Sequence, residues 1–195
     1  EALLGFEFPA PPTVMSVVFG WDFDALFFVM GIAACVYYTI GVMRLRSRGD
    51  AWPVSRTICW FIGWSIVIWA TNAGIATYSE VSVGIHMIQH MTITMMAPIF
   101  LVLPGPVPLA LRALKPSPSG GRGARELLTE GLHSRIAIFF TNPITILVIY
   151  ILGLYGLYLT NLFGSLMSSH IGHIAMTTHF LVSGLLLAYV AIGID

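Results

Sequence analysis

The chain has 195 residues, of which 9% are charged and 57% are hydrophobic, and its formal net charge is zero. Because soluble domains carry about 25% charged residues, this composition predicts an integral membrane protein. With no net positive charge and no basic arm, the sequence gives no support for nucleic-acid binding. Cys35 and Cys59 lack the spacing of a metal or redox pair, and we interpret them as small buried hydrophobes.

The first stretch, residues 1–20, contains three prolines, and we expect an extended surface segment there because proline interrupts helices. Five later segments approach the ~20 apolar residues that a helix needs to cross a membrane. These predicted spans are residues 25–44, 56–78, 81–103, 143–161 and 168–194. The expected fold class is all-α, a polytopic transmembrane helical bundle that forms a single membrane domain over residues 1–195.

Residues 104–142, between the third and fourth spans, are predicted to form a linker and an amphipathic helix. Prolines stop the third span, and residues 117–123 have the composition of a flexible linker. Residues 124–140 alternate apolar and charged side chains in a way that fits an interfacial helix. His133 belongs to this helix, and we expect it at the level of water or lipid headgroups.

The nine basic residues lie in or beside two connections, one after the first span and one after the third. The positive-inside rule places both connections in the cytoplasm. With five spans, the N-terminal segment then lies outside and Asp195 inside.

The other five of the six histidines lie in predicted spans, as His86 with His90 and as His170 with His173 and His179. Ionisable side chains at membrane depth are costly and by default mark a site. The predicted topology lets the third and fifth spans both enter from outside, so the two clusters fall in the outer half of the membrane. Spacings of four and three residues put each leading pair on one helix face. His179 is rotated by about 180° from His170, which makes it the weakest candidate.

Methionines accompany these histidines, and imidazole with thioether is a ligand set suited to copper, Cu(I) more than Cu(II). Met87, Met91 and Met95 recur beside the first pair, and Met176 follows His173 by three residues. Methionine is also a flexible core filler. We therefore predict a metal site formed by the histidines, with Met87, Met91 and Met176 as accessory ligands.

Two other interpretations of the histidines stay open. Buried histidines can hold helices together through hydrogen bonds to neighbours such as Gln89 and Thr92. Histidines on facing helices can also ligate haem b, although doubled histidines on each helix favour a smaller ion. The sequence has no Ser/His/Asp set, phosphate loop or paired carboxylates that would predict an enzyme.

Several sequence blocks resemble the CtaG-type cytochrome c oxidase assembly family. They are HMIQHM (86–91), AP (97–98), LPGP (103–106), LALRAL (109–114), HIGHIAM (170–176), HFL (179–181) and GID (193–195). The resemblance covers nearly the whole chain. Residues 44–53, RLRSRGDAWP, are similar to the actinobacterial variety, in which this module often follows a CopD-like copper-resistance domain in one polypeptide.

The resemblance implies a multi-pass bacterial plasma-membrane protein that is needed to assemble active haem-copper oxidase. Family members usually have about seven spans of the ~20 residues that a crossing needs, so we expect this chain to be a fragment of a longer protein. A start at Glu1 without an initiator methionine supports that expectation. Some members carry a histidine in the fourth span, where this sequence has Tyr155 and Tyr158.

We therefore predict a membrane assembly factor, not an enzyme, that handles or delivers copper through an outward-facing His/Met site. Its expected partners are the lipid bilayer, the cytochrome c oxidase subunits and an upstream CopD-like domain. A copper transporter or tolerance protein is the first alternative, because a site reachable from both sides would serve transport equally well. A haem b-binding electron-transfer subunit is the second.

Overall fold

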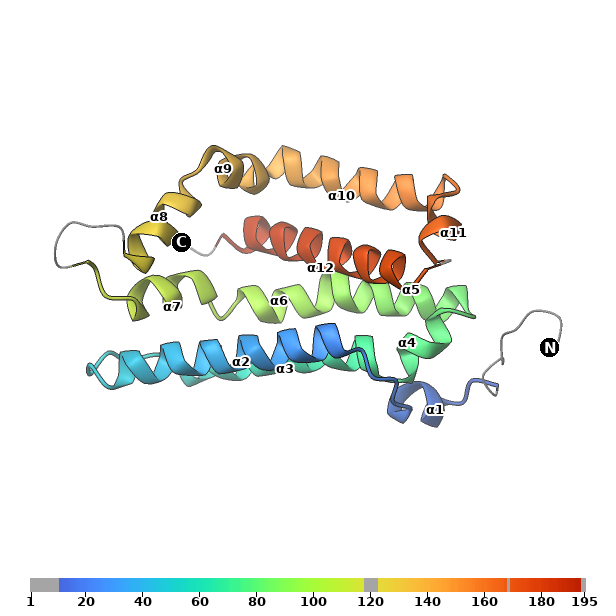
Figure 1. Ribbon diagram of the computed structural model, residues 1–195, viewed down its shortest axis with the longest axis horizontal. Helices are drawn as coiled ribbons and strands as arrows, with labels where there is room; N and C mark the ends of the chain where they lie inside the picture. Colours follow the sequence, from blue (N-terminus) through green and yellow to red (C-terminus); the bar gives the residue numbers. More distant parts are fainter. Residues whose placement is uncertain (1–10, 118–122, 168, 194–195) are drawn as a thin grey trace.

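Long helices run side by side through the molecule and are joined at both ends by shorter ones (Figure 1). The computed structural model describes residues 11–117, 123–167 and 169–193, without the side chains of Phe163, Met167 and His170. In chain order the helices are α1 (Val14–Phe19), α2 (Ala25–Arg46), α3 (Val54–Asn72), α4 (Gly74–Ser79), α5 (Val83–Met91), the π-helix η1 (Thr92–Met96), α6 (Ala97–Val102), α7 (Pro106–Ala113), α8 (Ala124–Leu132), α9 (Arg135–Thr141), α10 (Pro143–Tyr158), α11 (Leu162–Met167) and α12 (His170–Ile192). Over these ranges the only β-type pairing is an isolated bridge between Trp21 and Ala73. The all-α prediction is confirmed.

The helices are stacked in a simple order. α2 pairs with α3, α3 packs on α6, α12 packs on η1 and α6, and α10 covers α12 (Figure 1). Within the described ranges, four helical runs are long and apolar enough to cross a membrane: Ala25–Arg46, Val54–Asn72, Val83–Ala113 and Ile171–Ile192. A fifth crossing is present if α9 and α10, bent by 67°, count as one. The structure therefore has the multi-pass architecture that the sequence predicts.

The N-terminal segment differs from the extended form that we expected for residues 1–20. Residues 1–10 lie outside the described ranges, but α1 follows directly after the prolines. Thr13 caps this helix by accepting from the Ser16 amide, and the Ser16 hydroxyl oxygen accepts from the Thr13 amide. The capping box outweighs the prolines because they all precede it. The Trp69 indole then donates to the Val18 carbonyl at 3.0 Å and ties α1 to α3.

The second predicted span, residues 56–78, is split. α3 ends at Asn72 because the N-terminal segment takes over the hydrogen bonds that would continue the helix. The amide of Asp24 donates to the Asn72 side chain at 2.8 Å, and the amide of Asp22 donates to the Asn72 carbonyl at 2.7 Å. The Gly74 amide donates to the Gly20 carbonyl instead of continuing α3.

The third span contains a π-turn where a continuous helix was expected. Pro98 has no N–H, so the Thr94 carbonyl cannot receive its usual helical hydrogen bond. One turn earlier, the Ala97 amide donates to the Thr92 carbonyl, which is the i→i+5 bond of a π-helix. α12 approaches at this point, and a Cβ on Gly184 would clash with the Thr94 carbonyl oxygen. Backbone therefore packs directly against backbone.

The helix predicted for residues 124–140 is two helices, α8 and α9. Ser134 separates them, because its side chain caps α9 by accepting from the Ala137 amide at 3.1 Å. Asn142 then caps α10 by accepting from the Ile144 amide, and Pro143 occupies the first helical position. Side-chain caps thus define each change of direction on the way into α10.

The two basic connections meet at one end of the bundle. The Arg48 guanidinium donates to the carbonyls of Arg112 and Ala113, at 3.3 and 2.9 Å. α5 and the start of α12 lie at the other end (Figure 1). Both basic connections therefore lie on the same side of the bundle, as a shared location in the cytoplasm requires. That this side is the cytoplasmic one stays a prediction.

The orientation can be measured with an introduced cysteine. Asp50 lies exposed in the connection between α2 and α3, and D50C in a Cys35→Ser, Cys59→Ser background should react with an impermeant maleimide only from the cytoplasm. Intact cells and inverted vesicles supply the two sides. Labelling of intact cells would reverse the predicted topology.

The backbone contact at Gly184 predicts a large effect from a small substitution. Gly184→Ala should destabilise the bundle by about 1–3 kcal/mol, because the new methyl group meets a carbonyl that cannot move aside. Gly156→Ala is the matched control, since a Cβ there meets no atom within 4 Å. Thermal unfolding in detergent should separate the two variants. Equal stability would show that α12 does not depend on this close approach.

Candidate metal centre

The first histidine cluster is a directly bonded pair inside the bundle. His86 and His90 are 0% and 6% exposed, on the last turns of α5. Their Nε2 atoms are 2.7 Å apart, and their rings meet at 63° with centroids 4.2 Å apart. The four-residue spacing thus brings the two rings together as predicted, and the pair is shielded from lipid as well as from water.

A hydrogen bond between two neutral imidazoles requires one Nε2 that carries the proton and one that accepts it. The Ser79 backbone also hydrogen-bonds His86. The Nδ1 atom of His90 is buried and has no hydrogen-bond partner among the residues described. A buried polar atom in that state costs about 1–3 kcal/mol. Hydrogen bonds therefore hold the pair in place, while His90 Nδ1 stays without a hydrogen bond within the described residues.

α12 supplies the opposite wall of this site. His173 interacts electrostatically with both His86 and His90. Phe180 follows His173 by seven residues, so both lie on the same face of α12. The Phe180 ring packs against His90 with centroids 4.4 Å apart at 65°. His170 begins α12, but its side chain lies outside the described residues.

Gln89 connects the site to the break in α3. Its side-chain amide donates to the Ala70 carbonyl at 2.8 Å, and Gln89 is 2% exposed. Ala70 needs this partner, because the Gly74 amide that would normally bond it donates to Gly20 instead. Gln89 therefore completes the C-terminal end of α3 from the turn of α5 that carries His90.

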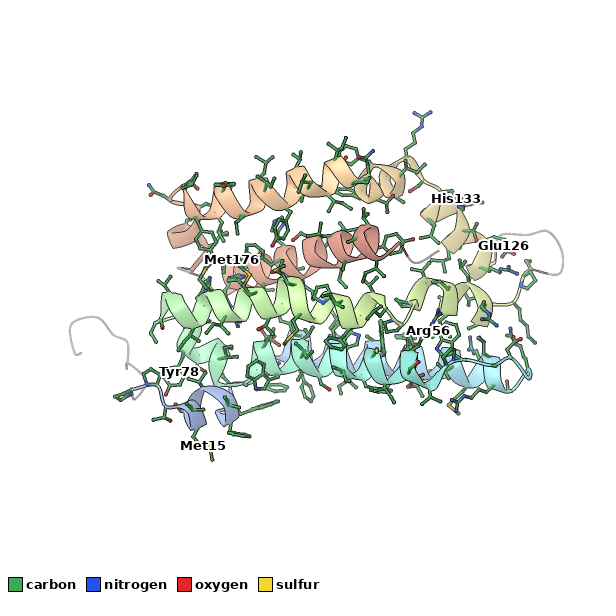
Figure 2. The ribbon with its side chains drawn as sticks, turned by 180° about the vertical axis from the view of Figure 1, so that it is seen from behind. Met15, Arg56, Tyr78, Glu126, His133 and Met176 are labelled. Carbon is green, nitrogen blue, oxygen red and sulfur yellow. The ribbon has the colours of Figure 1, made fainter. Side chains whose placement is uncertain are left out.

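His179 lies on a different face of α12 from the paired rings. It is exposed, and a Cβ on Gly153 of α10 would clash with its Nε2 atom. His179 and Met176 line a cavity of about 230 Å³ between α10 and α12. Met176 is 3% exposed and packs with Leu157 and Phe180, and Figure 2 shows it in the middle of the bundle. The structure thus groups Met176 with His179.

The remaining methionines of the predicted stripe differ in burial. Met87 is partly buried, whereas Met91 and Met95 are 44% and 53% exposed. In a membrane bundle this exposed surface faces lipid. Any role of Met91 beside the histidines would therefore require it to act from the lipid-facing side of α5.

The donor set fits a copper ion chemically. With metal–nitrogen bonds of ~2.0 Å, a 2.7 Å separation corresponds to an angle of about 85° at the ion. A tetrahedral angle would need about 3.3 Å, so the rings must open by roughly half an ångström. Over the described residues, no three His, Cys, Asp or Glu side chains are already arranged around one ion. Binding would therefore replace the hydrogen bond of the pair.

The sequence analysis did not identify Phe180 and Gly153 as neighbours of the histidines. The seven-residue spacing from His173 could have identified Phe180 as a neighbour of the site. Gly153 had no such signal, because its contact with His179 depends on how α10 packs on α12.

Replacing Gln89 should damage the bundle without touching a histidine. Q89L should cost about 1–3 kcal/mol, because the Ala70 carbonyl loses the side-chain donor that Gln89 supplies inside an apolar bundle. Ser65→Leu on the exposed face of α3 is the control, with no loss expected. Thermal unfolding in detergent is the measurement. A Q89L protein as stable as the control would mean that the bond to Ala70 contributes nothing.

A protein-family model described as cytochrome c oxidase caa3 assembly factor (Caa3_CtaG) matches residues 36–195. Uncharacterized proteins from Mycobacterium bovis and Mycobacterium tuberculosis are each 42% identical over 197 aligned residues, and one from Mycobacterium leprae is 37% identical over 196. The alignments cover 100% of this chain but 30% of each relative's length. No solved structure matches the chain.

The matched region includes the second half of α2 and everything after it, so it contains both histidine-bearing helices. The resemblance drawn from the sequence blocks is confirmed. The chain belongs to the Caa3_CtaG family of cytochrome c oxidase caa3 assembly factors.

Proposed function

We propose that this chain is the membrane domain of an assembly factor that handles or delivers copper to haem-copper cytochrome c oxidase in the bacterial plasma membrane. The single observation that carries the proposal is the buried pair of His86 and His90, with Nε2 atoms 2.7 Å apart and His173 facing them. The role is one of binding and transfer, without turnover chemistry. The chain covers 30% of the length of each relative, and the rest of that length leaves room for the CopD-like partner domain that the family resemblance implies.

Copper loading follows from the chemistry of the pair. Two neutral imidazoles share one hydrogen bond, and an ion that takes both Nε2 atoms would displace it. Loading would leave each ring protonated at Nδ1, which is the usual arrangement for an Nε2-bound ligand. Imidazole ligands accept copper in either oxidation state, and methionine sulfur favours Cu(I).

Release is as important as capture for a delivery protein. His86 and His90 come from one helix, and His173 comes from another, so an ion held by all three would depend on the contact of α5 with α12. Separation of the two helices would remove one ligand and weaken the ion's hold. A site with few ligands suits transfer to an oxidase subunit better than a closed four-ligand cage, which is typical of structural metals.

The proposal is tested by replacing both ligands of α5 with a residue that still forms hydrogen bonds. In the full-length protein, H86N/H90N should stay in the membrane, because asparagine can donate and accept at this position. Its copper affinity should fall by more than tenfold, since loss of an outer-shell partner alone costs about 10–100-fold. Purified oxidase from these cells should contain haem but less copper, as measured by metal analysis per haem.

His133→Asn is the matched control. His133 is exposed at the end of α8, with its Nδ1 bonded to the Thr129 carbonyl, and it lies far from Met176 (Figure 2). Normal oxidase copper with H86N/H90N present in the membrane would reject the ligand role. Loss of the double variant from the membrane would favour a purely structural role. A Soret band in the purified protein would favour haem binding, and lost copper tolerance with a normal oxidase would favour transport.

A further inference from the structure

A cavity of about 470 Å³ opens at the end of the bundle opposite to the histidines. It is lined by Arg44, Ser47, Arg48, Ala113, Leu114 and Lys115. These residues come from the end of α2 and the end of α7, which pack together at the left of Figure 1. The volume lies within the range of small-molecule sites, about 300–1,000 Å³.

The cavity has three cationic side chains and no acid in its lining. Arg48 is fixed in position by its bonds to the carbonyls of Arg112 and Ala113. The side chains of Arg44 and Lys115 make no hydrogen bond or ion pair within the described part of the chain. Among the residues that the structure describes, no acid in the lining balances the positive charge of this cavity.

Three other charged groups of this end, those of Arg56, Arg112 and Glu126, have partners of their own. Arg56 and Arg112 lie over the two-ring system of Trp52, with guanidinium carbons 5.1 and 5.7 Å from the ring centroid. Figure 2 shows Arg56 at the α7 end of the bundle. Glu126 accepts from the Ser117 amide at 3.1 Å, which holds the pKa of that carboxyl below its usual value.

The cavity also lies at the depth of lipid headgroups. α2 has 22 residues and is therefore ~33 Å long, close to the ~30 Å thickness of the hydrocarbon core. Its C-terminal end, which carries Arg44, then coincides with one membrane surface. Leu114 and Ala113 give the cavity an apolar side next to its charges.

We propose that this cavity binds the phosphate group of an anionic phospholipid from the adjacent leaflet. Two of the five N–H donors of the Arg48 guanidinium bond the carbonyls of Arg112 and Ala113, which leaves three donors for phosphate oxygens. Arg44 and Lys115 add positive charge to the cavity. The net negative charge of an anionic headgroup neutralises it, whereas a zwitterionic headgroup has no net charge to do so. Basic pockets between membrane helices commonly bind such headgroups.

The test compares two double variants with the same loss of charge, made in the full-length protein. R44Q/K115Q removes the two unpaired charges of the cavity, whereas R46Q/R135Q removes two exposed charges that do not line it. Binding of phosphatidylglycerol and of phosphatidylcholine is measured by native mass spectrometry. We expect R44Q/K115Q to lose about thirtyfold in its preference for phosphatidylglycerol, from roughly 1 kcal/mol for each of the two basic residues near the surface, with R46Q/R135Q unchanged.

Equal losses in both double variants would overturn the proposal, because they would indicate attraction by overall charge. Inorganic phosphate that binds the detergent-solubilised protein and displaces phosphatidylglycerol at equal concentration would also overturn it, in favour of a site for a soluble anion. If R44Q/K115Q does not fold, R44K/K115R keeps the charges and should retain full preference, while each single Gln variant should lose severalfold. A single variant with unchanged preference would count against the site.

Discussion

Hydrocarbon offers no hydrogen-bond partner, so each polar group inside this bundle needs one from the protein itself. The constraint explains why the polar residues of α5 are paired. Gln89 supplies the donor that the Ala70 carbonyl lacks where α3 is interrupted. His86 and His90 form a hydrogen bond with each other. His90 Nδ1 is the exception among these groups, because it stays unbonded within the described structure. The candidate site is thus one of the places where hydrogen bonding inside the described bundle is incomplete, together with the indole N–H groups of Trp60 and Trp64 and the hydroxyl of Thr94.

The two irregular points of the helices lie on either side of this site. α3 breaks after Asn72, and the third span shifts into a π-turn before Pro98. The first break creates the need for Gln89, which fixes the rotation of α5. The second exposes the Thr94 carbonyl to the close approach of Gly184 on α12. Together they set how α5 and α12 face each other, and so they position His173 opposite the histidine pair.

Local sequence patterns were sufficient to predict the helical architecture and the pairing of His86 with His90. They were not sufficient to predict details that depend on contacts between residues distant in the sequence. Apolar length predicted the spans, and a spacing of four predicted that His86 and His90 meet. The break after Asn72 depends on a bond from Asp24, 48 positions away in the sequence. The exposure of Met91 depends on which neighbouring helices cover α5. No sequence window contains such information, because it is a property of helix packing.

The two ends of the bundle have opposite chemistry, and this has a consequence for how the molecule sits in a membrane. One end keeps its imidazoles buried and bonded to each other, while the other carries the basic connections and a cavity with unbalanced positive charge. Charges that bind headgroups hold their end of α2 at one membrane surface, and the length of α2 spans the hydrocarbon from there. α3 packs on α2, η1 and α6 pack on α3, and α12 packs on η1 and α6. Because α5 continues directly into η1, anchoring the basic end also fixes the depth of His86 and His90 beneath the opposite surface. A partner that receives an ion from this pair would have to approach from that side.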